Sequence, residues 1–288
     1  MEWFERMCMA LEYIEGRLDG EFNVGEAACV ACSSLFHFQR MFHVLTGVTV
    51  ADYVRRRRLT LAAQELASSR VKVIDVALKY GYDTPESFSK AFRKMQGISP
   101  SAARVPGARL KAYPRLSFQI SLKGDKDMEY RIVEKKAFAV VGKSIRVTTK
   151  DGENFKRIPQ FWDECYQNGF NERLFAVAGD MGVLGMCMEF NQEQEEFTYM
   201  IAIEKPKGHV PENLEEKQIP SATWAVFESI GPMPDAIQKV WGRIFSEWFS
   251  ATGYEHADAP EIEVYPSGNT GDADYRCEIR IPVIRKGP

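Results

Sequence analysis

The segment Ser34–Gly47, which reads SLFHFQRMFHVLTG, decides the fold of the first part of the chain. Its large apolar side chains recur at helical spacing, at Phe38, Met41, Phe42 and Leu45. This spacing predicts a helix with one buried face. Ser34 is a good N-cap because its hydroxyl can accept a hydrogen bond from the first turn, and Gly47 can end the helix in the left-handed conformation.

The sequence contains a second copy of this unit. A shift of 50 positions aligns equivalent residues: Val24 with Ile74, Ala27 with Ala77, Phe38 with Phe88, Arg40 with Lys90, Phe42 with Phe92 and Gly47 with Gly97. In each copy we predict a short helix, a tight turn and a longer helix, with Thr84 as the second N-cap. A connecting helix from about Thr49 to Ser68 joins the copies. Residues 1–108 are therefore predicted to form an all-α domain with two helix-turn-helix units.

A helix-turn-helix that binds DNA places its second helix in the major groove, so the face opposite the core must offer polar or basic side chains. On the first long helix the residues expected to contact DNA are Ser34, Phe36, His37, Gln39, Arg40 and His43. Gln39 can pair with adenine, and Arg40 with guanine or a phosphate. On the second they are Thr84, Glu86, Ser87, Lys90, Arg93 and Lys94. We expect the second set to contact phosphates more than bases.

Charge is distributed unevenly along the chain. Residues 1–112 carry 16 Lys and Arg against 12 Asp and Glu, whereas the remaining residues carry 21 against 28. A basic first half favours nucleic acid as a partner, and an acidic second half favours cations. The run Arg55–Arg58 can contact phosphates or can form a solvated face of the connecting helix.

Three motifs together resemble the AraC/XylS family of transcription regulators: the segment 34–47, Tyr53-x4-Arg58-Leu, and the segment 74–94 with its Gly81-Tyr82 and Phe88-Ser-Lys-Ala-Phe-Arg-Lys94. The resemblance covers roughly residues 5–108. It implies two recognition helices in adjacent major-groove segments about one turn (~34 Å) apart, with double-stranded DNA and RNA polymerase as partners. By position it assigns base reading to Phe36, Gln39 and Arg40, the corresponding second-helix places to Pro85, Glu86 and Lys90, and a structural role to Arg58. Pro85 and Glu86 differ from the amide residues that some relatives use there.

The second half of the chain has a different pattern. Helical periodicity fades into a polar stretch rich in Pro and Gly, so we predict a linker at residues 109–127 and a second domain at 128–288. Alternating strands follow, with helices at about 155–168 and 235–252. The strand-helix-strand-strand pattern occurs twice, since FAVV at 138–141 is echoed by WAVF at 224–227. This predicts an α+β domain with antiparallel sheet, helices on one face and a cleft between the halves.

The second half resembles the GyrI-like effector-binding domain, through this duplication, the strand EIEVYP at 261–266 and the closing YRCEIRIPV at 275–283. The resemblance implies a cleft lined by aromatic residues, with a carboxylate at its base that selects small, cationic and apolar ligands. The combination of the two domains resembles the arrangement of Rob-like regulators, with multidrug sensing as one expected role.

We predict that Glu263 is this carboxylate. Strand periodicity puts Glu261, Glu263 and Tyr265 on one face, and Tyr275 and Cys277 on one face of the last strand, so Glu263 and Tyr275 can both face the cleft. Further effector-binding candidates are Trp162, Tyr166, Tyr199 and Trp224. Aromatic faces attract a cation, and a carboxylate adds charge complementarity. If the register is shifted by one residue, Glu278 is the acid instead and Cys277 turns outward.

An enzyme is the alternative class, because some GyrI-like proteins are hydrolases that use a Glu and a Tyr. The sequence shows no Ser/His/Asp order, phosphate loop or metal-ligand cluster, and its four histidines, at 37, 43, 209 and 256, are dispersed. We therefore expect no catalytic residue, no cofactor and no metal.

Six scattered cysteines indicate reduced thiols rather than a disulfide framework. Cys29 and Cys32 form a C-x-x-C without a second ligand pair, so we interpret them as core packing in a helix-turn. Met1 is followed by Glu2 and a Trp-Phe pair, and no apolar run reaches the length of a membrane span, so we expect a cytoplasmic protein without a membrane partner.

Overall fold

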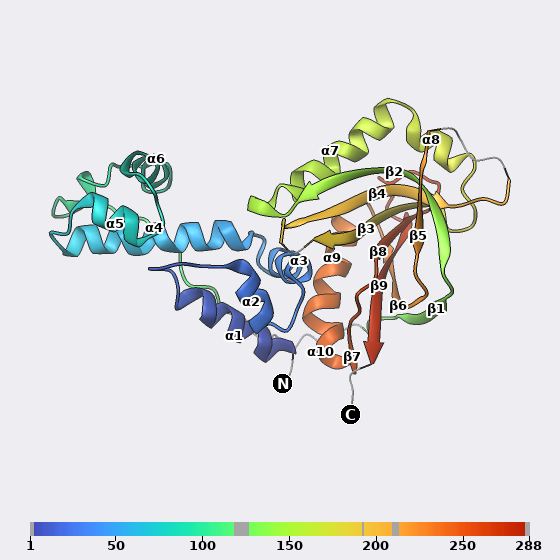
Figure 1. Cartoon of the computed structure of the whole chain (residues 1–288), viewed down its shortest axis with the longest axis horizontal. Helices are drawn as coiled ribbons and strands as arrows, with labels where there is room; N and C mark the ends of the chain where they lie inside the picture. The colour runs from blue at the N-terminus through green and yellow to red at the C-terminus, as the bar shows by residue number, and fades with distance from the viewer. Residues whose placement is uncertain (1–2, 118–126, 192, 209–212, 286–288) are drawn as a thin grey trace. The chain divides into compact units, whose positions relative to one another are not determined.

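The computed structural model describes residues 3–117, 127–191, 193–208 and 213–285 (Figure 1). The chain divides into two compact units, Met1–Ser121 and Leu122–Pro288. The part of the predicted linker at residues 118–126 lies outside the described residues.

The first unit is all-helical, as predicted. Its helices are α1 (Trp3–Glu15), α2 (Val24–Val30), α3 (Leu35–Thr46), α4 (Val50–Ser68), α5 (Val73–Lys79), α6 (Pro85–Gln96) and the short 3₁₀ turn η1 (Ala102–Arg104). The helix pairs α2–α3 and α5–α6 are the two helix-turn-helix units, and α4 connects them. Figure 1 shows α3 at the end where α4 begins and α6 farther along α4.

Local sequence explains where the two long helices begin and end. The Ser34 side chain accepts a hydrogen bond from the backbone N–H of His37, and the Thr84 side chain from that of Ser87. Gly47 and Gly97 end the helices at φ 72° and 79°, the left-handed region in which glycine costs least.

After η1, residues 110–116 run back alongside α4. The Gln96 amide makes two hydrogen bonds with the Lys111 backbone, at 2.8 and 2.7 Å. Tyr113 N donates to the Thr60 hydroxyl at 2.9 Å, and Leu116 N donates to the Tyr53 hydroxyl at 3.1 Å. Residues 110–116 of the predicted linker are thus attached to the first unit.

The second unit is an α+β domain, as predicted. Its strands are β1 (Arg131–Lys135), β2 (Phe138–Thr148), β3 (Val183–Asn191), β4 (Glu196–Glu204), β5 (Glu215–Ile219), β6 (Ala222–Ile230), β7 (Tyr254–His256), β8 (Glu261–Tyr265) and β9 (Arg276–Arg285). The helical segments are η2 (Lys150–Gly152), α7 (Asn154–Gln167), α8 (Phe170–Phe175), α9 (Asp235–Arg243), a π-helical turn (Ile244–Trp248) and α10 (Phe249–Ala251).

The sheet order reflects the predicted duplication. All described pairs are antiparallel, in the order β1-β6-β9-β8-β3-β4-β2-β5, with β7 beside β9. One module contributes β2, α7, β3 and β4, and the other contributes β6, α9, β8 and β9. β1 and β5 exchange places: β1, which precedes β2 in the chain, pairs with β6, and β5, which precedes β6, pairs with β2. The central pair, β3 with β8, sets Gly185 opposite Glu263.

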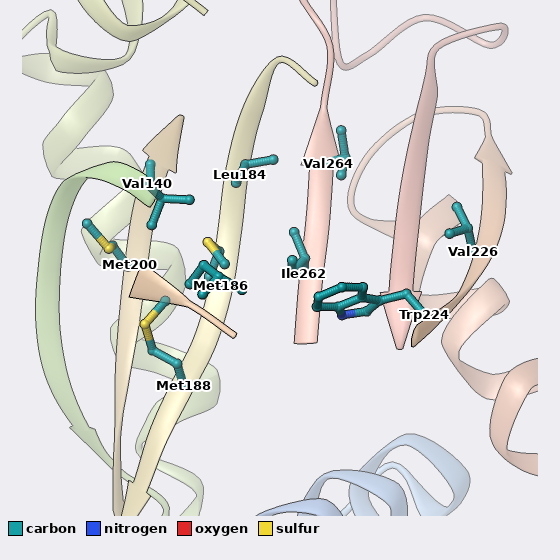
Figure 2. Packing of buried hydrophobic residues seen from close by; sticks show 11 residues of the cluster. Val140, Leu184, Met186, Met188, Met200, Trp224, Val226, Ile262 and Val264 are labelled. Carbon is teal, nitrogen blue, oxygen red and sulfur yellow. The ribbon is translucent and has the colours of Figure 1, made fainter. Parts of the chain in front are cut away.

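The two faces of the sheet differ. One face, here called the core face, holds a buried cluster of Val140, Leu184, Met186, Met188, Met200, Ala202, Ile219, Trp224, Val226, Ile262 and Val264, most of which Figure 2 shows. Lys135 of β1 pairs with Glu204 of β4 at 2.7 Å, although four strands separate β1 from β4. The sheet therefore curls around the core face. The opposite face, here called the helix face, is the one that α7 and α9 reach.

Candidate functional site

On α6 and at its N-cap, every residue predicted to contact DNA is exposed: Thr84, Glu86, Ser87, Lys90, Arg93 and Lys94. The opposite side of the helix is buried at Phe88 and Phe92, which pack with α4 and α5. This division arises because apolar residues at i and i+4 fall on one side of a helix. The three cations at positions 90, 93 and 94 are therefore accessible on one short helix.

On α3, Ser34 is the N-cap, and Phe36, His37, Gln39, Arg40 and His43 lie within the helix. Ser34 is exposed, and Gln39, Arg40 and His43 are at least partly exposed. The Arg40 guanidinium lies over the Phe36 ring, 6.0 Å from its centroid. Burial lowers the pKa of His43 below its usual value. Base reading by α3 remains a prediction.

The four arginines of the run on α4 differ in exposure and in their partners. Arg57 forms two hydrogen bonds with the Glu15 carboxylate, each at 2.9 Å, and a third with the Tyr113 carbonyl. Arg58 donates to the carbonyls of Leu18 and Gly20, as expected for a structural residue. Arg55 and Arg56 are exposed; Arg55 pairs with Asp52, and Arg56 lies over the Tyr113 ring.

In the second unit, Glu263 lies on the helix face between two aromatic donors. Trp241 of α9 donates its Nε1–H to one carboxylate oxygen at 2.8 Å, and Tyr265 donates its hydroxyl to the other at 2.9 Å. Both donors are neutral, and together they fix the orientation of the carboxylate. Burial and the nearby Glu263 charge raise the pKa of Tyr265 well above its usual value, so Tyr265 stays protonated and acts as a donor.

An aromatic group surrounds this carboxylate. Trp162 of α7 packs edge-on against Tyr265, with ring centroids 5.2 Å apart, and donates its Nε1–H to the Tyr199 hydroxyl at 2.8 Å. Tyr166 follows Trp162 on the same helix, and the centroids of the two rings are 6.1 Å apart. Tyr166 is 50% exposed. Of the predicted residues, the structure thus brings Glu263, Trp162, Tyr166 and Tyr199 together.

Gly185 allows the aromatic side chains to reach the sheet. A Cβ at this position would lie 2.5 Å from the Tyr199 hydroxyl oxygen and 3.4 Å from the rings of Trp162 and Tyr265. Only a residue without a side chain fits beneath three converging aromatic groups. We call Glu263, Tyr265, Trp241, Trp162, Tyr199 and Gly185 the Glu263 cluster.

Tyr275 lies beside this cluster. It is 7% exposed and donates its hydroxyl to the carbonyl of Pro266, the residue after Tyr265. Burial raises its pKa to about 12. Burial also raises the pKa of the Cys277 thiol to about 11, so this thiol is protonated and unreactive at neutral pH.

Two candidates for the effector site lie elsewhere in the structure. Trp224 was expected near the effector, but it lies on the core face, 2% exposed, and donates to the Pro260 carbonyl at 3.1 Å. The alternative acid, Glu278, also has its side chain on the core face, because it pairs with Val264. There it forms ion pairs with Arg131 and Arg280. The C-x-x-C interpretation was wrong as well, since Cys29 and Cys32 are both exposed.

Sequence reasoning missed Trp241 and Gly185. Trp241 is 22 positions before Glu263 in the chain, and only the packing of α9 on the sheet brings them together. A glycine inside the apolar strand sequence VLGMCMEF was the available signal, because such a glycine often marks a close approach of another group. None of the helices that the structure describes is both long and apolar enough to cross a membrane.

Comparisons with known proteins agree with this two-unit organisation. Residues 131–283 match the family model described as integron-associated effector binding protein, and residues 27–105 match a helix-turn-helix domain. The transcriptional activator AarP of Providencia stuartii is 40% identical over 95 residues, which are 33% of this chain and 70% of AarP. The transcriptional regulator Rob of Salmonella typhimurium is 25% identical over 284 residues, 96% of each chain.

A solved structure described as a putative bacterial transcription regulation protein from Staphylococcus aureus MU50 is also similar. It is 28% identical and covers 56% of this chain and 100% of its own, with a TM-score of 0.47. The matches to the two domains and to Rob over nearly the whole length lead to one conclusion: this chain belongs to the AraC-family transcription regulators that carry an integron-associated, GyrI-like effector-binding domain behind the DNA-binding domain, in the arrangement of Rob.

Proposed function

We propose that this DNA-binding transcription regulator responds to a small cationic, apolar effector that binds at the Glu263 cluster. The observation that carries the proposal is the carboxylate of Glu263, oriented by the Trp241 indole and the Tyr265 hydroxyl among further aromatic rings. A cation over an aromatic face gains about 0.5–2 kcal/mol, more when it is desolvated, and a carboxylate adds direct charge complementarity.

The chemistry of the donors supports a cationic rather than an anionic effector. The indole N–H and the hydroxyl are neutral donors, so they hold the carboxylate without placing a positive charge beside it. An anionic effector would meet a carboxylate and the negative faces of the rings, which is unfavourable. The exposed ring of Tyr166, next to Trp162, offers apolar surface for the uncharged part of the effector.

The experiment compares the wild-type chain with two Glu→Gln variants, one on the helix face of the sheet and one on the core face. Benzyltriethylammonium should raise the melting temperature of the wild type, because a ligand that binds only the folded state stabilises it, by about 2.7 kcal/mol at 100 times Kd. Glu263→Gln should lose this shift, whereas Glu278→Gln on the core face should keep it. An uncharged aromatic compound of similar size should give a smaller shift. An equal shift in Glu263→Gln would contradict the proposal.

We also propose that α3 and α6 contact DNA through the side chains predicted above, with RNA polymerase as a further partner and the cytoplasm as the location. The exposure of Lys90, Arg93 and Lys94 supports phosphate contacts by α6. On an operator selected from genomic fragments, Arg40→Ala should weaken specific binding by about 1–3 kcal/mol. Lys90→Ala should weaken binding to all sequences and reduce the salt slope by about one. An unchanged footprint and affinity for Arg40→Ala would contradict base reading by α3.

A second candidate, hydrolysis by a Glu and a Tyr, is favoured by the 2.9 Å hydrogen bond between Tyr265 and Glu263. Incubating the protein with reactive electrophiles tests it. Turnover that Glu263→Gln abolishes would support this activity, and no turnover above a buffer control would reject it.

A further inference from the structure

Two exposed cysteines lie at the turn of the first helix-turn-helix unit. Cys29 is in the last turn of α2, and Cys32 is in the turn that leads to α3. Both are exposed free thiols, whereas Cys165, Cys187 and Cys277 are buried. The accessible pair has no role in the contacts described above.

The backbone holds the two cysteines close together. Cys32 N donates to the Cys29 carbonyl at 2.9 Å, and Ser33 N donates to the Ala28 carbonyl at 3.0 Å. This pair of bonds is the Schellman pattern that ends a helix. A hydrogen-bonded turn of four residues brings its first and last Cα atoms within about 7 Å. A disulfide requires a Cα separation of about 4.4–6.8 Å, so the turn sets a compatible spacing.

Cys32 also occupies a backbone position that favours glycine. Its φ is 50°, in the left-handed region. The second unit has the same pair of bonds after α5, and there the left-handed residue is Gly81, at φ 80°. A side chain in this conformation is less favourable than glycine, because its Cβ crowds the backbone. The first unit thus carries a thiol where backbone stability alone would favour glycine.

We propose that Cys29 and Cys32 form a redox-active dithiol that exchanges with low-molecular-weight disulfides. One thiolate attacks a sulfur of the small disulfide, which forms a mixed disulfide and releases one small thiol. The second thiolate then attacks the protein sulfur of the mixed disulfide, which forms the Cys29–Cys32 bond and releases the second small thiol. Two cysteine thiols are oxidised, one small disulfide is reduced, and the two thiol protons end on the two released thiols.

The site is placed to affect DNA binding. Ser34, the N-cap of α3, is two residues after Cys32, and Ser33 between them holds the turn through its backbone. A disulfide across this turn changes the start of the proposed recognition helix. This regulatory consequence rests on the proposed contact of α3 with DNA, whereas the formation of the disulfide does not.

The first experiment measures the bond itself in the full chain. The protein is equilibrated with mixtures of reduced and oxidised glutathione, alkylated and digested with trypsin. The peptide Leu18–Arg40 contains Cys29 and Cys32 and no other cysteine. We expect a form of this peptide that is unalkylated, lighter by two hydrogen atoms and reversible by dithiothreitol. Cys29→Ser and Cys32→Ser should each abolish it, whereas Cys8→Ser should leave it unchanged. Stable glutathione adducts without the internal bond would overturn the proposal.

The second experiment measures affinity for the selected operator. Oxidised wild type should bind several-fold more weakly than reduced wild type and recover on reduction, and the double variant Cys29→Ser, Cys32→Ser should bind equally under both conditions. A disulfide that forms without any change in affinity would overturn the regulatory role. Failure of the reduced protein to bind any DNA would instead refute the proposed function, and the peptide result would stand independently.

Discussion

The two faces of the sheet in the second unit place similar residues in opposite roles. Glu263 and Glu278 lie on the neighbouring strands β8 and β9, but on opposite faces. Glu263 accepts hydrogen bonds from an indole and a phenol, whereas Glu278 forms ion pairs with Arg131 and Arg280. The charge of Glu278 is balanced by Arg131 of β1 and by Arg280 of its own strand, β9. The comparison teaches that the neighbours on a face, and not the residue type, decide what a carboxylate can bind.

The tryptophans follow the same division. Trp224 on the core face is fully packed and donates to a backbone carbonyl, whereas Trp241 reaches the helix face and donates to Glu263. Removing the indole of Trp224 should therefore mainly reduce stability, whereas substitutions in the Glu263 cluster should also change effector binding.

The largest effect is expected for Trp224→Ala. The indole is 2% exposed within the core-face cluster, so its removal leaves a cavity and should cost about 3–5 kcal/mol of unfolding free energy. Urea denaturation followed by circular dichroism measures this. Tyr166→Ala, at a 50% exposed position on α7, is the control and should change stability far less. Similar losses of unfolding free energy in Trp224→Ala and Tyr166→Ala would contradict the assignment of Trp224 to the packed core face.

A smaller effect is expected for Gly185→Ala. The new methyl group would meet the Tyr199 hydroxyl at 2.5 Å, and overpacking of this kind costs about 1–3 kcal/mol. Because Tyr199 is only 3% exposed, it cannot move away freely, and its hydrogen bond with Trp162 should be lost. Tryptophan fluorescence and the thermal shift with benzyltriethylammonium should both change. In Gly179→Ala, where no heavy atom lies within 4 Å of a Cβ, neither should change.

The smallest effect is expected for Glu278→Gln and depends on pH. Burial raises the pKa of Glu278, but the hydrogen bonds from Arg131 and Arg280 outweigh burial and hold the pKa below its ordinary value. A carboxyl with a lowered folded pKa stabilises the protein above its unfolded pKa, and this contribution disappears as the pH falls through the folded pKa. Glu278→Gln should cost up to about 1 kcal/mol at pH 7 and less at pH 3. A pH-independent difference between variant and wild type would show that the ion pairs contribute nothing.

Strand periodicity predicted part of the Glu263 cluster. It put Glu263 and Tyr265 on one face of β8, and the structure has them there, hydrogen bonded to each other. Periodicity could not have placed Trp224 on a face, because β6 is buried on both sides over residues 224–227 and shows no alternation there. It also gave no information about Trp241, which reaches the cluster from another element.

Composition misled the interpretation of Cys29 and Cys32. Small apolar neighbours suggested core packing, yet α2 is short and buries Ala27 and Ala28 instead. The C-terminal turn of the helix then directs the next residues outward. Seven residues of helix are too few for periodicity to establish which side is buried.

The sequence by itself determined the helix ends, the repeated helix-turn-helix unit and the alternation of β8, because caps, glycines and spacing act between residues close in the chain. Only the tertiary structure decided that β1 and β5 each pair with a strand of the other module. It also decided that α9 brings Trp241 to Glu263 and that Glu278 forms ion pairs with arginines on the core face. These contacts join residues far apart in the chain, and their partners are selected by how the sheet curls and the helices pack on it.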